Sequence, residues 1–304
     1  MWGWVRHAAA TGFVVLGGYF AVSMAQTPAA KGKTAVSWTV RWQPARLVNG
    51  APVWFQVKPP ARLQSLSGKW LDHDVAFYLD PKTRTWDGLG GVALDVRPGV
   101  YTLALSGRTE ADKEISFQRT VRVGAAKYRS IAITVEGKYT APDPEQLKQI
   151  SEAKVVKDEV FHRPMIGREW KGSFQAPVEA PISDVFGTRR TFNGEVKSVH
   201  QGLDFGAAPG SVVSAVNDGT VLLARPLYFE GNFVVLDHGQ GLLTLYLHLS
   251  EFKVKEGEKV TRGQPIGLVG STGRATGPHL HFAVRWQGVY LDPEILLRLK
   301  LPRL

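Results

Sequence analysis

Two histidines separated by a single residue, in the segment Gly277-Pro278-His279-Leu280-His281-Phe282, constrain this chain more than any other feature. The segment continues to Trp286 with apolar, branched and aromatic residues, which predicts a β-strand. Because the side chains of a strand alternate between its two faces, we expect His279 and His281 to point the same way. Two imidazoles held side by side suit a metal ion, or one metal ligand beside one acid–base group.

Other histidines of the C-terminal half strengthen this interpretation, because a lone pair on a strand is a weak signal. The chain has 8 histidines. His200 begins an H-x-x-x-D unit that ends at Asp204, and His248 lies in the alternating run 245–250. A spacing of four along an extended chain returns His200 and Asp204 to one face. The segments therefore predict a shared site for metal binding or acid–base chemistry.

The composition limits what that site can contain. Cysteine is absent, so the chain has no disulfide, no thiol nucleophile and no cysteine zinc site. A transition metal must therefore be held by His, Asp or Glu. The formal net charge is +10 and the pI is about 9.7. A basic surface of this kind suits a polyanionic partner such as nucleic acid, anionic lipid or an acidic cell-wall polymer.

The first 25 residues have the pattern of a signal peptide. A short basic start at Arg6 and His7 precedes the apolar run 8–22, and Ser23-Met24-Ala25 supplies the small residues that signal peptidase requires. The alternative is an uncleaved membrane anchor, since the apolar run is close to spanning length. Both interpretations predict an exported protein, in the periplasm or at the cell surface. Nucleic acid is then not an expected partner, and membrane contact is expected only with an uncleaved anchor.

The rest of the chain predicts an all-β protein with a helical connector. Short alternating segments between turns indicate a β-sandwich over residues 35–137, whose Pro-Gly-x-Tyr-x-Leu turn resembles bacterial immunoglobulin-like domains. Its five tryptophans are interpreted as core or edge aromatics rather than a sugar-binding platform. Residues 138–172 form the connector, and Asp143 is the expected N-cap of its one helix. Residues 173–304 predict a compact antiparallel β domain that ends in a short helix.

Three separated motifs of this last domain, in order, resemble the lysostaphin-type, LytM-like zinc endopeptidases of bacterial cell walls. The resemblance covers about residues 174–292. Its motifs are His200-x-x-x-Asp204, Tyr246-x-His248-Leu249-Ser250 and Ser271-Thr272-Gly273-x-x-x-Gly277-Pro278-His279-Leu280-His281-Phe282, supported by Phe186-Gly187-x-Arg189 and glycine turns from Gly257 to Gly270. No position that the family uses for metal binding or catalysis is substituted.

The resemblance implies that His200, Asp204 and His281 are zinc ligands. Three protein ligands leave a fourth tetrahedral position for water, which is typical of catalytic zinc, and this set fits Zn²⁺ better than calcium or magnesium. Zinc lowers the pKa of bound water towards about 7. The family assigns His248 and His279 to water activation and to stabilisation of the tetrahedral intermediate; which histidine does which stays open.

Three further residues are candidates for substrate contacts. Tyr246 is expected on the same strand face as His248, with simple core packing as the alternative. Arg189 and Arg190 could bind substrate carboxylates, although an exposed hairpin arginine is the ordinary explanation.

We therefore expect an exported zinc endopeptidase that hydrolyses cross-links or stem peptides of peptidoglycan. A non-catalytic wall-binding module that activates another hydrolase is the main alternative. A third interpretation is a polysaccharide-binding protein led by the tryptophan-rich domain. The sequence does not choose between glycine bridges and D-amino-acid cross-links as the bond that is cleaved.

Overall fold

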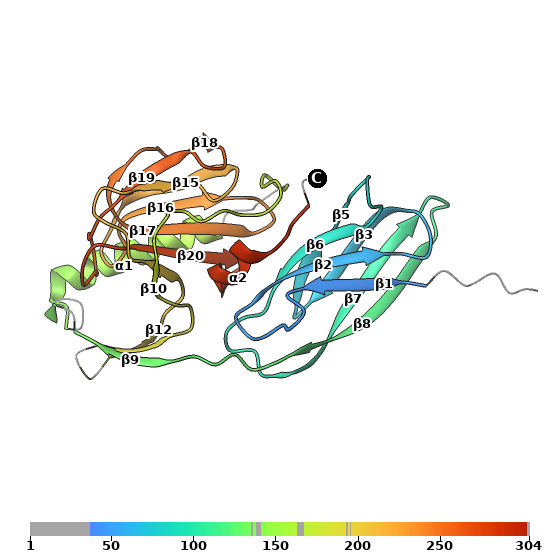
Figure 1. The fold of residues 1–304 in the computed structure, drawn as a ribbon, viewed down its shortest axis with the longest axis horizontal. Coiled ribbons are helices and arrows are strands. Elements are labelled where there is room, and N and C mark those ends of the chain that lie inside the picture. Colours follow the sequence, from blue (N-terminus) through green and yellow to red (C-terminus); the bar gives the residue numbers. More distant parts are fainter. Residues whose placement is uncertain are drawn as a thin grey trace, which may run out of the picture. The chain divides into compact units, whose positions relative to one another are not determined.

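Alternating apolar residues over the first third of the chain build two four-stranded antiparallel sheets (Figure 1). The first sheet has the order β1 (Thr39–Gln43), β2 (Pro52–Lys58), β6 (Trp86–Gly91), β5 (Tyr78–Leu79). The second has the order β4 (His73–Ala76), β3 (Leu63–Trp70), β7 (Gly99–Thr109), β8 (Glu114–Val123). Trp54, Trp70 and Trp86 are buried, so these tryptophans belong to the core.

The computed structural model describes residues 37–134, 136–137, 141–162, 167–192, 194 and 196–302. The signal peptide predicted for residues 1–25 lies outside the described residues. Among those that are described, no helix is both long and apolar enough to cross a membrane.

The stretch between the two sheets and the C-terminal half contains one strand and one helix. Helix α1 (Pro144–Phe161) begins as predicted, with a capping box in which the Asp143 side chain accepts from the Gln146 backbone and the Gln146 side chain accepts from the Asp143 backbone. Strand β9 (Ser130–Ile133), which we expected within the sandwich, instead pairs in parallel with β11 (Arg189–Phe192). Strand β11 in turn pairs with β12 (Val196–Val199) to complete a three-stranded sheet. Alternation identified β9 as a strand but carries no information about its partner.

A ten-stranded antiparallel sheet forms most of the C-terminal half. Its main order is β10 (Ile182–Asp184), β13 (Leu203–Phe205), β20 (Leu280–Trp286), β17 (Leu242–Phe252), β16 (Gly231–Asp237), β15 (Gly219–Leu227), β18 (Lys259–Val260). Strand β19 (Pro265–Val269) pairs with β14 (Val212–Ser214) and β17, and β21 (Val289–Leu291) pairs with β20. Helix α2 (Pro293–Arg298) follows the N-cap Asp292. The all-β fold class predicted from the sequence is confirmed.

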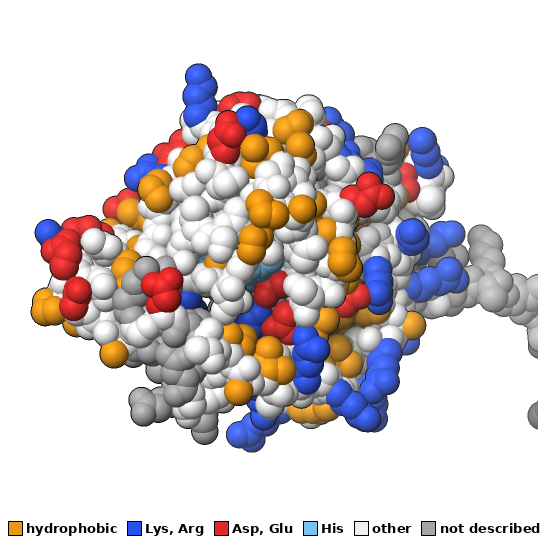
Figure 2. Space-filling model, turned by 60° about the vertical axis from the view of Figure 1, so that its left-hand side comes forward, with side chains coloured by type: hydrophobic (Ala, Val, Ile, Leu, Met, Phe, Trp, Pro, Cys, Tyr) orange, Lys and Arg blue, Asp and Glu red, His pale blue; other side chains and the backbone are white. Residues whose placement is uncertain are grey.

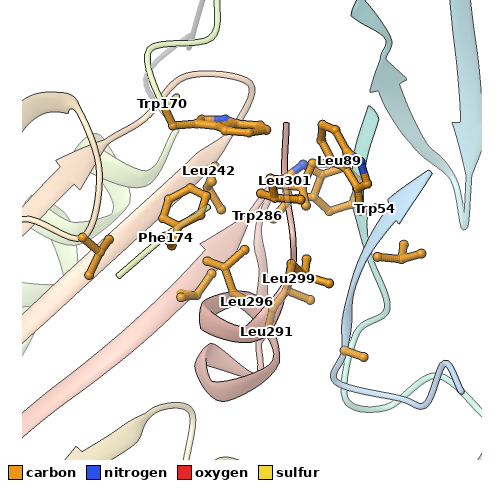
Figure 3. Close-up of a cluster of buried hydrophobic side chains, with 14 of the residues drawn as sticks. Trp54, Leu89, Trp170, Phe174, Leu242, Trp286, Leu291, Leu296, Leu299 and Leu301 are labelled. Atoms are coloured by element: carbon orange, nitrogen blue, oxygen red, sulfur yellow. The ribbon is translucent and has the colours of Figure 1, made fainter. Parts of the chain in front are cut away.

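A continuous apolar cluster joins the first two sheets to the C-terminal half (Figure 3). The rings of Trp54 in β2 and Trp170 meet edge to face, with 5.6 Å between their centroids. Trp286 in β20 and Leu296 in α2 belong to the same cluster. Both halves of the chain therefore bury aromatic surface against each other.

Replacement of Trp170, which is 1% exposed, should destabilise the whole chain. We expect Trp170→Ala to lower the free energy of unfolding by about 3–5 kcal/mol, because the change removes a large buried ring and leaves a cavity. Denaturant titration followed by circular dichroism measures the loss. Trp38→Ala is the control, since Trp38 is only partly buried. A loss at Trp170 no larger than at Trp38 would contradict the importance of the cluster.

Candidate metal centre

Three adjacent strands bring the predicted site residues together. In the β13–β20 pair Asp204 lies directly opposite His281, and in the β20–β17 pair His281 lies opposite Leu247, the neighbour of His248. His200 precedes β13, and its backbone N–H donates to Thr188 and its carbonyl accepts from Gly187. Strand register therefore places side chains from distant parts of the sequence at one point.

The ligating atoms of His200, Asp204 and His281 converge. His200 Nε2 lies 3.0 Å from Asp204 Oδ1 and 3.0 Å from His281 Nδ1. His281 Nδ1 lies 2.7 Å from the same Asp204 Oδ1. Two nitrogens and one carboxylate oxygen thus enclose a single small volume, and each of the three could bind the same ion.

The tautomer of His200 makes this volume suitable for a cation. Its Nδ1 donates to the Val185 carbonyl at 2.8 Å, because a carbonyl can only accept. The Nε2 atom of the neutral ring is then unprotonated, and its lone pair faces the Asp204 carboxylate. A histidine ligand held through its second nitrogen in this way is typical of metal sites. The donor set and its orientation therefore fit a divalent metal ion.

A close backbone approach lets His281 reach this position. A Cβ atom at Gly202 would lie 2.5 Å from both Cε1 and Nε2 of the His281 ring. The glycine between His200 and Asp204 therefore leaves the space that the third ligand occupies.

Asp204 is held on its other side by an arginine. Arg190 Nη2 donates to Asp204 Oδ2 at 2.6 Å, and the same guanidinium contacts Asp184. Burial raises the pKa of Asp204, but the hydrogen bonds and charges of His200 and His281 lower it by more, so the pKa lies below its usual range. Asp204 is therefore an ionised carboxylate.

His248 and His279 complete a row of four imidazoles. The ring centroids of His248 and His279 are 4.9 Å apart, and those of His248 and His281 are 6.1 Å apart. His248 Nδ1 donates to the Thr272 carbonyl and His279 Nδ1 to the Gly277 carbonyl, both at 2.8 Å. Each ring therefore keeps an unprotonated Nε2 when it is neutral.

Two features control the state of His248. Its backbone has φ of 65°, in the left-handed region that is uncommon for residues other than glycine. Burial, followed by the charges of His281 and His279, lowers the pKa of His248 to about 3. His248 is therefore a neutral proton acceptor at neutral pH. Burial likewise lowers the pKa of His281, which favours the neutral form that binds metal.

The four histidines line a cleft of about 540 Å³. Figure 2 shows histidine surface at the bottom of a hollow, with acidic and basic side chains beside it. Part of the wall comes from Ile131 and Ile133 of β9 and from Phe161 of α1. The lining also includes Phe229 and Pro278.

The three residues predicted as substrate contacts lie in different surroundings. Tyr246 is fully buried, where its hydroxyl accepts from the Val216 backbone and the Thr244 hydroxyl, so it packs in the core. Arg189 is exposed, whereas Arg190 lines the cleft with its guanidinium turned to the two carboxylates. The sequence analysis did not identify Asp184, because no motif histidine lies next to it in the chain. The only signal near it was the Phe186-Gly187-x-Arg189 motif, which indicates a turn.

Known proteins are similar in sequence to this part of the chain. The sequence profile of peptidase family M23 matches residues 198–293. Peptidoglycan DD-endopeptidase ShyA of Vibrio cholerae is 49% identical over 89 residues, which cover 29% of this chain and 21% of ShyA. Peptidoglycan DD-endopeptidase ShyC of the same organism is 39% identical over 132 residues, which cover 42% of this chain and 30% of ShyC. The chain thus spans less than a third of the length of either relative.

A solved structure extends the similarity beyond the matched domain. A crystal structure from Pseudomonas aeruginosa, whose description names peptidase M23, superposes with a TM-score of 0.62 at 27% sequence identity. The superposition covers 83% of this chain and 95% of the other. Residues 198–293 are a peptidase M23 domain, homologous to the LytM- and lysostaphin-type peptidoglycan endopeptidases.

Proposed function

We propose that this protein is an exported zinc-dependent endopeptidase that hydrolyses peptide bonds of peptidoglycan. The observation that carries the proposal is the convergence of His200, Asp204 and His281 within 4.8 Å of one another, next to two further histidines in an open cleft. The Vibrio relatives are named as peptidoglycan DD-endopeptidases, which supports peptidoglycan as the substrate and favours a cross-link between D-amino acids as the bond. The basic net charge of +10 suits an acidic wall polymer.

In this proposal His200 Nε2, Asp204 Oδ1 and His281 Nδ1 hold the metal. Peptidases of family M23 are zinc enzymes, and nitrogen ligands with one carboxylate suit that ion. Bound zinc would lower the pKa of a water molecule and polarise the carbonyl of the scissile bond. Three protein ligands leave a coordination position for this chemistry.

His248 and His279 move protons in this scheme. Each ring has its Nδ1 committed to a backbone carbonyl, which leaves Nε2 as the nitrogen that can exchange a proton, and both residues line the cleft. One Nε2 accepts the proton of the attacking water, and the resulting imidazolium can return it to the leaving amine. The second ring stabilises charge that develops on the carbonyl oxygen when its Nε2 carries a proton, because Nε2 is the nitrogen that is not committed to a backbone carbonyl. The lowered pKa of His248, about 3, keeps its ring neutral at neutral pH.

The remaining parts of the chain have supporting roles in the proposal. Residues 1–25 direct export to the periplasm or the cell surface and are removed or retained as an anchor. The two sheets of β1–β8 form an immunoglobulin-like domain, the stretch from β9 to residue 172 a connector, and residues 173–304 the peptidase domain. Arg189, which is exposed, is the remaining candidate for contact with a substrate carboxylate.

Removal of zinc should abolish hydrolysis. We expect the purified chain to solubilise cell-wall sacculi, to lose that activity with a chelator, and to regain it with zinc but not with magnesium. Release of soluble muropeptides measures the activity, and mass spectrometry of the fragments identifies the bond. Hydrolysis that continues unchanged in the metal-free protein would contradict the proposal. Zinc binding without hydrolysis of any wall substrate would favour the activator alternative.

Substitution should separate metal binding from proton transfer. We expect His281→Ala to lose both zinc and activity. His248→Ala and His279→Ala should retain zinc but lower kcat by about 10²- to 10⁴-fold, the usual contribution of a positioned acid–base group. Metal content is measured by elemental analysis and kcat on a defined muropeptide. His162→Ala is the control, because His162 is exposed at the end of α1. Full activity of both His248→Ala and His279→Ala would exclude the assigned roles.

A further inference from the structure

Arg190 links the proposed metal ligand Asp204 to a second buried carboxylate. Its Nη2 lies 2.6 Å from Asp204 Oδ2 and 2.5 Å from Asp184 Oδ2, and its Nε lies 3.0 Å from the same Asp184 oxygen. The Arg190 side chain is 16% exposed, and those of Asp184 and Asp204 are 10% and 9% exposed. The three groups therefore form an ion-pair network that is largely shielded from water.

In this network the two oxygens of Asp204 have different partners. Oδ2 is occupied by Arg190, whereas Oδ1 is the oxygen that faces His200 Nε2 and His281 Nδ1. With its second oxygen held in this way, the carboxylate presents Oδ1 as the oxygen nearest the other two proposed ligands. The guanidinium also fixes the plane of the carboxylate, because charge-assisted hydrogen bonds of this length are directional.

Asp184 is held firmly enough to anchor the arginine. Its Oδ1 accepts from Arg129 Nη2 at 2.6 Å, from the Thr188 hydroxyl at 2.9 Å and from the Val185 backbone at 2.9 Å. Asp184 also gives Arg190 a second negative partner beside Asp204, whose charge would be shared with the proposed metal ion. The turn that begins at Asp184 further supplies the Val185 carbonyl that orients His200. One short segment thus positions two of the three proposed ligands.

We infer that Arg190, anchored by Asp184, is a positioning residue that holds Asp204 as a single-oxygen ligand. The inference rests on the proposed metal site and assigns Arg190 a role in metal binding in place of substrate binding. It predicts that loss of the guanidinium frees Asp204 Oδ2 and lets the carboxylate rotate. Both the affinity for zinc and the geometry around the metal then change.

The test measures metal binding directly, without activity. Zinc affinity is determined by competition with a chelator of known affinity, and the visible spectrum of the Co²⁺-substituted protein reports the coordination geometry. We expect Arg190→Gln to weaken zinc binding by about 10- to 100-fold, the usual effect of losing a group that orients a metal ligand. We also expect its cobalt spectrum to differ from that of the unmodified chain.

Arg189→Gln is the matched control, because it removes the same charge from the adjacent, exposed residue of β11. Its zinc affinity should stay within about twofold of the unmodified chain, in keeping with the weak effect of exposed charges on neighbouring sites. Arg190→Lys keeps the charge but lacks the planar fork that contacts two carboxylates, so it should also bind zinc more weakly. Arg190→Lys replaces Arg190→Gln as the test variant if thermal melting indicates that Arg190→Gln does not fold.

The outcomes separate this inference from the proposed function. Zinc affinity within about twofold and an unchanged cobalt spectrum in the folded Arg190 variant would overturn the positioning role, by the same exposed-charge criterion as the control. Lower thermal stability with unchanged zinc affinity would also overturn it, since that result indicates a purely structural ion pair. Failure of the unmodified chain to bind zinc would instead contradict the proposed function itself.

Discussion

The pairing of β13, β20 and β17 is the constraint on which the candidate site depends. The register that sets Asp204 opposite His281 fixes two of the converging side chains, and the same strand β20 aligns with β17 next to His248. A slip of one residue would turn these side chains to the other face of the sheet. The apolar residues between them, such as Leu280 and Phe282, are fully buried and oppose such a slip. The buried core residues therefore fix the strand register that brings the site residues together.

Around this frame the chain orients each imidazole through its backbone. Val185, Thr272 and Gly277 offer carbonyls to the Nδ1 atoms of His200, His248 and His279 respectively. Backbone carbonyls hold these rings without introducing further charge into a crowded site. The close approach of Gly231 and Gly273 brings the loop that contains Thr272 against β16. The glycines, which have no side chain, thus leave the space that the loop needs to orient a histidine of the site.

Short sequence patterns predicted much of the fold and of the site, but they did not predict contacts between segments that are distant in the chain. Short stretches of sequence contain the motif histidines and Asp204, so their clustering could be predicted. A short stretch also contains the capping residues of α1, so the start of that helix could be predicted. Tyr246 was expected on the same strand face as His248, with core packing as the alternative. The structure shows core packing, because His248 has a left-handed backbone next to an irregularity in the strand pairing, which breaks the alternation of faces. Leu245 and Leu247 line the cleft instead. The contact of Arg190 with Asp184 and Asp204 depends on strands that meet only in the fold.

The parallel pairing of β9 with β11 determines where the chain can be cut. A fragment that begins at residue 173 would contain all four cleft histidines yet leave the edge of β11 without its neighbour. It would also lack Arg129, whose carbonyl accepts from the Arg189 backbone and whose guanidinium holds Asp184. Excision at the apparent border of the catalytic half therefore removes part of its own scaffold. A self-sufficient fragment has to start upstream of Tyr128, whose ring packs against Phe186.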